Sequence, residues 1–232
     1  MNALVLQNDG MILAGGSAAG NFGIARLDAN GNLDLNFDTD GTLTKDVRLG
    51  NNDFITSISI QPDNKILSVG YSSNGSGTDV SVVRFLANGS IDNSFDTDGQ
   101  LEYSPAYSTD DARAMVVQPD GKILVTGQYR NTNITSSAIV RYLPEGELDP
   151  SFGTGGKMLF PGGGDWELVE SIALQSDGKI LIGGNVDSEM TIWRFNADGT
   201  PDLGFGVAGK VVVPAGSGTV RAISVQSDGT IL

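Results

Sequence analysis

Short apolar runs separated by polar, glycine-rich turns recur along the whole chain. One representative unit contains four such runs, at residues 114–118, 122–127, 137–143 and 157–160. The runs are rich in Val, Ile and Leu, and Gly, Asp or Pro residues bound them, which is the pattern of short β-strands. No segment sustains an apolar period of 3.6 residues. The pattern therefore predicts an all-β protein with almost no helix.

The same order of apolar runs and turns repeats several times along the chain. The phrase QPDGKIL, or a close copy of it, begins at Gln7, Gln61, Gln118, Gln175 and Gln226. A second phrase of the form RYLPEGELDPSF begins at Arg26, Arg84, Arg141 and Arg194. Successive glutamines of the first phrase are 54, 57, 57 and 51 residues apart. The chain thus contains four full repeats and the opening of a fifth.

Four strands per repeat at this spacing predict a β-propeller, in which each repeat forms one four-stranded antiparallel blade. The repeats cover about residues 1–54, 55–111, 112–168 and 169–219, and residues 220–232 hold the first two strands of a fifth. Together they are expected to form a single β-propeller domain, or a fragment of one, over residues 1–232. A solenoid is the rival architecture, but its coils are usually shorter per turn. We expect a longer array that closes with more blades; closure by two chains, or by four blades alone, is the alternative.

The composition restricts the chemistry that is open to the chain. With 14 Lys and Arg against 28 Asp and Glu, the net charge is −14, which argues against nucleic acid as a partner. The chain has no Cys and no His, which excludes a Ser-His-Asp or Cys-His mechanism and a zinc site of the usual kind within it. No apolar run approaches the roughly 20 residues of a membrane span. We therefore predict no cofactor, no nucleic-acid partner and no membrane insertion.

Residues that recur in every repeat are expected to hold the blade together. Each arginine of the second phrase is predicted to pair with turn carbonyls or with an acid of its own repeat. These acids are Asp34, Asp92, Asp149 and Asp202. The phenylalanines 37, 95, 152 and 205 are predicted to anchor the long turn, where burial of each contributes roughly 1.5–3 kcal/mol. The alternative is a ring of arginines that binds anions in a central channel.

The acids of the stretch DANGNLDLNFDTDG suggest a calcium loop, because calcium takes six to eight oxygen ligands. The EF-hand order is not met, since Gly31 follows Asn30 directly. Repeats three and four read GTGG and GVAG where the first two read DTDG. A metal needed in every blade would not survive this loss, so we predict no metal site.

The connections between strands fall into a constant set and a variable set. In an antiparallel meander, the turns after strands one and three lie at one end of the blade, and both are nearly constant. The connections after strands two and four lie at the other end and differ in every repeat. Aromatic residues of the variable set are predicted to bind a ligand: Tyr71, Tyr103, Tyr107, Tyr129 and Trp166. Such residues suit stacking on a sugar or a polar protein surface, although they could simply pack beneath their own loops.

The repeated phrases resemble those of the bacterial delta-60 repeat family of β-propellers over almost the whole chain. Small departures occur: Asn64 replaces the turn glycine, Met11 and Thr230 replace the turn lysine, and Pro201 stands where Leu or Ile is usual. The resemblance implies part of a large secreted or surface protein of bacteria, beside adhesion-type modules. It brings no catalytic residues.

Two functions follow from these observations. The first is a non-catalytic interaction or scaffold module, secreted or on the bacterial cell surface, that binds a protein or glycan through its variable loops. Open sheet edges could also pair two copies of the chain into a homo-oligomer. The second is a carboxylate-based carbohydrate-active enzyme, a glycosidase or a lyase. Its candidate acids are Asp110, Asp111, Asp165, Glu167, Asp187 and Glu189. The absence of His and Cys favours the first, so we expect no enzyme.

Overall fold

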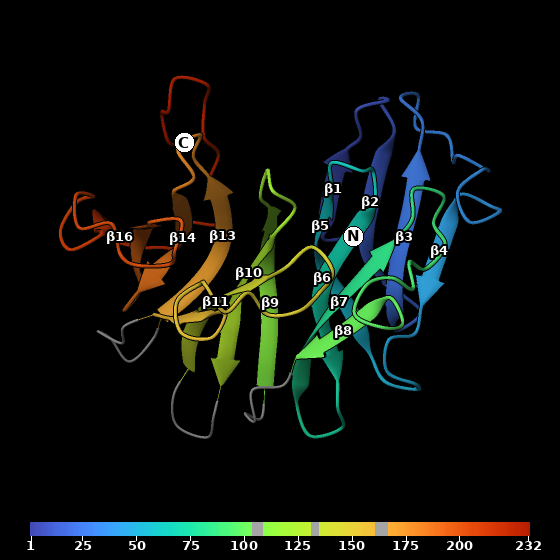
Figure 1. Cartoon of the computed structure of the whole chain (residues 1–232), viewed down its shortest axis with the longest axis horizontal. Helices are drawn as coiled ribbons and strands as arrows, with labels where there is room; N and C mark the ends of the chain where they lie inside the picture. The colour runs from blue at the N-terminus through green and yellow to red at the C-terminus, as the bar shows by residue number, and fades with distance from the viewer. Residues whose placement is uncertain (104–108, 131–134, 161–166) are drawn as a thin grey trace. The chain divides into compact units, whose positions relative to one another are not determined.

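The computed structural model of the chain consists of β-strands joined by turns (Figure 1). It describes residues 1–103, 109–130, 135–160 and 167–232, and within these ranges only the backbone of Tyr129, Arg130, Thr135, Glu167, Pro214 and Ala215. These ranges contain no helix, as the sequence pattern predicted. A membrane-spanning helix is accordingly not found among them.

The strands form four sheets, which we call blades 1 to 4. Blade 1 contains β1 (Ala3–Leu6), β2 (Ile12–Ala18), β3 (Asn21–Leu27) and β4 (Thr42–Lys45). Blade 2 contains β5 (Asp53–Ile60), β6 (Ile66–Ser73), β7 (Thr78–Phe85) and β8 (Gln100–Tyr103). Blade 3 contains β9 (Thr109–Val117), β10 (Ile123–Arg130), β11 (Thr135–Tyr142) and β12 (Lys157–Leu159). Blade 4 contains β13 (Glu167–Leu174), β14 (Ile180–Val186), β15 (Glu189–Phe195) and β16 (Lys210–Ser217). Within each blade the strands lie side by side in chain order, so the predicted four-stranded antiparallel blades are confirmed.

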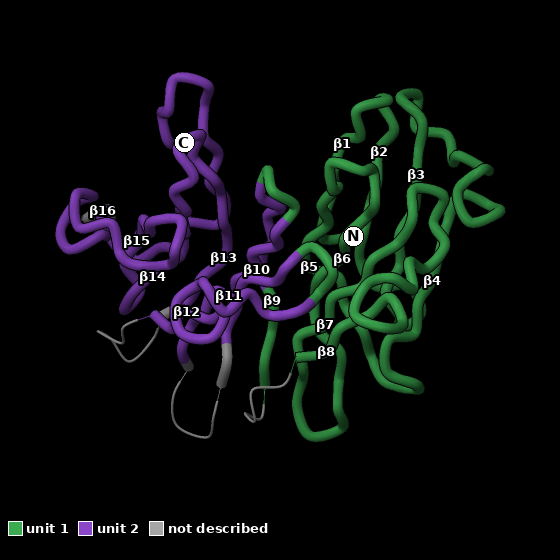
Figure 2. Tube along the Cα trace, in the orientation of Figure 1, with its two compact units in different colours: residues 1–112, 119–121, 144–146 green, residues 113–118, 122–143, 147–232 purple. Residues whose placement is uncertain are grey.

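The chain divides into two compact units (Figure 2). Unit 1 comprises residues 1–112, 119–121 and 144–146, and unit 2 comprises residues 113–118, 122–143 and 147–232.

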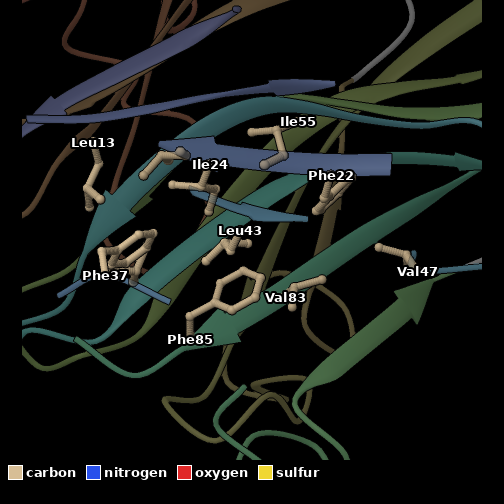
Figure 3. Close-up of a cluster of buried hydrophobic side chains, with 11 residues drawn as sticks. Leu13, Phe22, Ile24, Phe37, Leu43, Val47, Ile55, Val83 and Phe85 are labelled. Atoms are coloured by element: carbon tan, nitrogen blue, oxygen red, sulfur yellow. The ribbon is translucent and has the colours of Figure 1, made fainter. Parts of the chain in front are cut away.

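Unit 1 has its core between the facing sides of blades 1 and 2 (Figure 3). The cluster consists of Leu13, Phe22, Ile24, Phe37, Leu43, Val47, Ile55, Ile58, Ile66, Val83 and Phe85. Alternation along each strand sends every second side chain to this side, which is why the sequence reads as short apolar runs. The two sheets approach so closely that a Cβ on Gly15 would overlap the side chain of Ile58.

Unit 2 has a second core, built from the same positions of blades 3 and 4. The cluster consists of Leu124, Ile139, Phe152, Phe160, Val169, Ile180, Ile182, Trp193 and Phe195. Phe160 packs edge-on against both Trp193 and Phe195, with ring centroids 5.2 and 5.4 Å apart and interplanar angles of 82°. Edge-to-face pairs of this kind contribute about 0.5–1.5 kcal/mol beyond area burial.

The phrase QPDGKIL and its copies form the turn between the first two strands of each repeat. In the second repeat, the N–H of Gln61 donates to the carbonyl of Lys65, and the N–H of Asn64 donates to the carbonyl of Gln61. The Asp63 side chain accepts the N–H of Lys65 at 3.2 Å. Glycine usually holds the fourth position because φ is positive there, and Asn64 tolerates the same conformation with φ at 65°. This geometry explains both the repetition and the one exchange of Gly for Asn.

The phrase that begins with arginine forms the turn between the last two strands. Arg84 Nε donates to Asp92 Oδ2 at 2.7 Å, and its guanidinium lies 4.8 Å from the ring centroid of Phe95. The other three repeats contain the same Arg–Asp pair, at 2.8 Å in each, and the same Arg–Phe contact. Of the four phenylalanines, Phe37, Phe95 and Phe152 are fully buried. The predicted structural role of these arginines and phenylalanines is therefore confirmed.

The same arginine also reaches the following repeat. Arg26, Arg84 and Arg141 donate through Nη1 to the carbonyls of Ala87, Pro144 and Ala197, at 2.5 to 2.6 Å. A second bond runs beside each, from the N–H of Asp38, Asp96 and Gly153 to the carbonyls of Asn88, Glu145 and Asp198, at 2.8 to 2.9 Å. We call each such pair of bonds the inter-repeat hydrogen bonds. They join successive repeats through backbone acceptors.

The opening of the fifth repeat forms only part of what the sequence predicted. Its turn is present, since the N–H of Gln226 donates to the carbonyl of Thr230. In place of two paired strands, a single bridge joins Val225 and Ile231. Two strands, with no third to cover them, bury too little apolar surface to be stable.

Candidate functional site at the variable end of blade 2

The strands of blade 2 extend further towards the variable end than the sequence pattern indicated. Strand β6 continues to Ser73 because each residue after Gly70 still pairs with a partner on β7, ending with Ser73 opposite Thr78. Tyr71 and Tyr103 therefore lie in strands, not in loops as predicted, and the same correction applies to Tyr129 in β10. Strand positions hold a side chain more rigidly than a loop does.

Two of the predicted binding residues meet in one row across blade 2. The register places Phe54 opposite Tyr71, Tyr71 opposite Val80, and Val80 opposite Tyr103. All four are partly exposed, and the rings of Phe54 and Tyr71 lie 5.3 Å apart at 31°. We call these four residues the aromatic row. It offers flat, amphipathic surface at the variable end, which suits a sugar ring or a polar peptide.

The side chains of the other three predicted binding residues are not described. Only the backbone of Tyr129 is described. Tyr107 and Trp166 lie outside the described residues.

The opposite side of blade 2 buries acids close to the same end. Asp53 and Asp79 are 0% and 3% exposed, and each pairs with Ser72 across the sheet. Asp79 accepts from Arg48 Nη2 at 2.8 Å and from Asn74 Nδ2 at 3.0 Å. Asp53 accepts the N–H of Val47 at 2.8 Å. These bonds fix the loops before and after the acids.

Arg48 is the cationic partner of Asp79. It bridges Asp79 to Glu102, so one guanidinium serves two carboxylates. The hydrogen bond that Arg48 donates to Glu102, with the nearby charges of Glu102 and Asp79, raises the pKa of Arg48 above its usual value although burial opposes this.

Asp110 is the most unusual acid of the chain. It is 1% exposed, and neither carboxyl oxygen has a hydrogen-bond partner within the described structure. Burial raises its pKa to about 7, and the charges of Asp79 and Asp111 add to the shift. Asp111, the next residue along β9, accepts the hydroxyl of Thr78 at 2.6 Å. A carboxyl poised near neutral pH beside a second buried carboxylate is typical of sites that handle protons.

Two of the remaining predicted acids lie in unit 2. Asp187 and Glu189 are exposed at the tight hairpin between β14 and β15, where Asp187 and Ser188 have positive φ. This is the geometry of a two-residue primed turn. Only the backbone of Glu167 is described, and Asp165 lies outside the described residues.

Sequence reasoning missed Asp53, Asp79 and Arg48. One signal could have found the first of them, because Asp53, Asp110 and Glu167 follow each other at intervals of 57 residues, at the same place in three repeats. No signal of that kind marks Asp79, which reaches Asp110 only through the arrangement of strands in unit 1.

The acids of the first long turn, considered above for calcium, are already engaged. Asp28 accepts the N–H groups of Asn30 and Asn32, and Asp34 accepts from Arg26. Across the described ranges, no group of three acidic side chains is arranged to hold a metal ion.

The repeats identify the family of the chain. The family model "Domain of unknown function (DUF5122) beta-propeller" matches residues 7–37, 61–95, 118–152 and 175–205. These matches cover more than half of the chain, so the protein belongs to this β-propeller family. Each match begins at the glutamine of the first phrase and ends at the phenylalanine of the second. No curated protein matches the chain.

Solved structures resemble the chain in fold alone. The PQQ-bound form of an aldose sugar dehydrogenase from Streptomyces coelicolor is 13% identical, with a TM-score of 0.59, over 99% of this chain and 72% of that one. A protein of unknown function from Dyadobacter fermentans is 11% identical, with a TM-score of 0.45, over 86% of this chain and 50% of that one. A streptogramin B lyase structure is 13% identical, with a TM-score of 0.45, over 100% of this chain and 81% of that one. The chain therefore spans half the length of the Dyadobacter protein.

Proposed function

We propose that the chain is a non-catalytic interaction module of a secreted or surface protein of bacteria, which binds a protein or a glycan at its variable end. The delta-60 resemblance supports the bacterial and extracellular setting, and a net charge of −14 suits a soluble extracellular module. A homo-oligomer remains part of this proposal. The module needs neither cofactor nor catalytic group.

The contrast between the two ends of the blades carries the proposal. At the constant end, the repeated Arg, Asp, Phe and Gly residues form the turns and the inter-repeat hydrogen bonds. At the variable end, Tyr71 and Tyr103 keep exposed surface on a rigid strand scaffold. Rigid aromatic side chains bind with little loss of conformational entropy, so they are the residues from which a ligand gains most.

A glycan array tests the proposal directly. The wild-type chain is applied to immobilised plant, animal and bacterial glycans beside the double variant Tyr71→Ala/Tyr103→Ala. The matched control is Tyr142→Phe, which changes a buried tyrosine in β11. We expect the control to bind as the wild type does and the double variant to lose at least tenfold in affinity. If the wild-type chain binds no glycan on the array, the glycan part of the proposal is wrong. A photo-crosslinking amino acid at position 71 then tests for a protein partner.

Asp110 favours one second candidate, a glycosidase or lyase that uses Asp110 as the acid and Asp79 as the second acidic residue. The unpartnered oxygens of Asp110 and its pKa of about 7 support it. An exposure of 1% opposes it, because a substrate must reach the carboxyl. Assays with chromogenic glycosides and with polyuronate decide the point. Turnover that disappears in Asp110→Asn would establish the enzyme, and turnover that is equal in both proteins, or absent, would remove Asp110 as its acid.

A further inference from the structure

The tripeptide Asn-Gly-Ser occurs twice in unit 1, at residues 74–76 and 88–90. In such a sequence the side chain of the asparagine can react with the backbone nitrogen of the glycine, since glycine has no Cβ to hinder the approach. The first copy forms the turn between β6 and β7, and the second lies in the turn after β7. Because the two tripeptides are identical, a difference in their reactivity must come from the surroundings that the fold provides.

The two copies differ first in the backbone nitrogen that would attack. In the second copy, the N–H of Gly89 donates to the carbonyl of Leu86 at 2.9 Å, so its nitrogen is engaged within the turn. In the first copy, the N–H of Gly75 has no backbone acceptor in the described structure, and its nitrogen lies 3.5 Å from the hydroxyl oxygen of Ser73. Gly75 is exposed, whereas Gly89 is buried. Water therefore reaches the N–H of Gly75 and can take its proton, which leaves the nitrogen able to attack Asn74.

The side-chain carbonyl of Asn74 lies among three hydrogen-bond donors. The N–H and the hydroxyl of Ser76 donate to Asn74 Oδ1 at 3.0 and 3.1 Å, and the N–H of Gly77 donates to it at 2.7 Å. Attack on Cγ turns this oxygen into an oxyanion, and donors that already point at it stabilise the tetrahedral intermediate. In the second copy, Asn88 Oδ1 accepts from the N–H and the hydroxyl of Ser90, and no third donor is described. The fold thus favours attack on Asn74 over attack on Asn88.

The amide group of Asn74 is also fixed in orientation by an acid. Asn74 Nδ2 donates to Asp79 Oδ1 at 3.0 Å, and Asp79 is 3% exposed. This bond and the bonds to Oδ1 restrict the side chain of Asn74, so little conformational entropy remains to be lost in the reaction. Within the described structure, no acid accepts from Asn88 Nδ2. The turn between β6 and β7 therefore combines an accessible nucleophile, stabilisation of the oxyanion and a fixed electrophile.

We propose that Asn74 is a site of self-modification, at which the folded protein deamidates its own asparagine. The backbone nitrogen of Gly75 gives its proton to water and forms a bond to Cγ of Asn74. The bond from Cγ to Nδ2 then breaks, and Nδ2 takes up a proton and leaves as ammonia. Water opens the resulting succinimide ring, which gives isoaspartate by cleavage at the main-chain carbonyl or aspartate by cleavage at Cγ. The reaction consumes water, releases ammonia and involves no oxidation or reduction, and it is independent of the binding proposed above.

The product places a negative charge where the unmodified turn has a donor. A carboxylate at position 74 would face Asp79 over the distance that the hydrogen bond now spans, and the two charges would repel each other in a partly buried place. Isoaspartate would also lengthen the backbone of the turn that joins β6 to β7. The pairing of Ser73 with Thr78 and of Tyr71 with Val80 depends on this turn. Deamidation would therefore loosen the variable end of blade 2.

Peptide mapping of the full chain tests the proposal. The protein is kept at physiological temperature and pH, in buffer and in urea, and samples are digested with trypsin and analysed by mass spectrometry. Asn74 is the one asparagine in the tryptic peptide of residues 66–84, and Asn88 lies in the peptide of residues 85–113, where fragment ions separate it from Asn93. In buffer we expect Asn74 to deamidate about tenfold faster than Asn88 or more, and in urea we expect similar rates. Equal rates in buffer, or a rate at Asn74 that is lower in buffer than in urea, would overturn the proposal.

Two pairs of variants separate the role of the turn from its sequence. Ser76→Ala removes the hydroxyl donor to Asn74 Oδ1 and should slow deamidation of Asn74 severalfold, whereas the matched control Ser90→Ala should leave that rate unchanged. An unchanged rate in Ser76→Ala would show that the hydroxyl gives no assistance. Asn74→Asp should lower the midpoint of urea unfolding, because its carboxylate faces Asp79, and Asn88→Asp, at an exposed residue, should not. Equal midpoints in these two variants would refute the effect on the variable end.

Discussion

Arg84→Met tests whether the repeated arginine is the main polar link in unit 1. Arg84 is 1% exposed, and its guanidinium binds Asp92 at 2.7 Å, the carbonyl of Pro144 at 2.6 Å and the hydroxyl of Ser94 at 3.0 Å. Methionine keeps much of the apolar contact with the ring of Phe95 but removes every donor. Among the described residues, Asp92 would then keep Lys65, at 3.1 Å, as its one cationic partner.

The size of the loss follows from burial. Removal of one partner from a buried ion pair costs about 3–5 kcal/mol, and an acceptor left unpaired costs about 1–3 kcal/mol. Lys65 and Ser94 offset part of the first term, so we expect Arg84→Met to lower the free energy of unfolding by about 3–5 kcal/mol in all. For a chain of this size, each 1 kcal/mol shifts the melting temperature by about 2–4 °C. A decrease of about 10–15 °C is therefore expected.

Equilibrium urea unfolding, followed by far-UV circular dichroism, measures this change. Trp193 lies in the core of unit 2, so its fluorescence, recorded in parallel, reports on that unit. Arg221→Met, at an exposed arginine, is the matched control and should stay within about 0.5 kcal/mol of the wild type. A cost below about 1 kcal/mol for Arg84→Met would refute the reasoning, because the buried pair would then contribute no more than a surface pair.

Three further predictions concern pH and backbone space. Burial alone would raise the pKa of Asp92, but hydrogen bonds from Ser94 and Lys65 and the charge of Arg84 lower it to about 2, so about 2 kcal/mol of stability is present above pH 4 and lost between pH 4 and 2. Across this range the wild type should lose about 2 kcal/mol more than Asp92→Asn in unfolding experiments, because the other acids with lowered pKa values, such as Asp34 and Asp149, are common to both proteins. Asp110 has a raised pKa of about 7, so its contribution is complete below pH 4 and lost as the pH rises through 7. Relative to the wild type, Asp110→Asn should therefore gain up to about 4 kcal/mol between pH 4 and pH 8, and a constant difference would show that Asp110 is solvated. Gly184→Ala should lower the free energy of unfolding in urea by about 3 kcal/mol, because the new Cβ would overlap the carbonyl of Leu168. Gly178→Ala should lower it by only about 1 kcal/mol, because the site has free space and only its positive φ opposes alanine. Equal losses in the two variants would contradict this, because the sheet would then shift to accommodate the new Cβ at Gly184.

The strands, turns and Arg–Asp pairs could be predicted from sequence because each is local and each is written several times. Arg84 and Asp92 lie eight residues apart in one turn, and four copies of that turn leave little freedom in the interpretation. The family match rests on these same residues.

The candidate site could be predicted only in part, because its residues come together through tertiary contacts. Tyr71 and Tyr103 meet across the intervening Val80, and this row depends on the register of three strands. Asp79 and Asp110 come from different blades, and nothing in the spacing of 31 residues indicates that their charges interact. The mistake about the loops has a local cause. Polar residues such as Ser72 and Ser73 read as turn residues, although pairing with β7 keeps them extended.

The inter-repeat hydrogen bonds have a consequence for how such genes can change. Their acceptors are the backbone carbonyls of Ala87, Pro144 and Ala197, and every residue type has a carbonyl. A point mutation at the acceptor position therefore leaves the carbonyl in place. Both Ala and Pro occur at this position in the chain. A substitution of the arginine, by contrast, removes the donor. A whole repeat gained or lost in frame by recombination would arrive with its donor and its acceptor already matched to any neighbour.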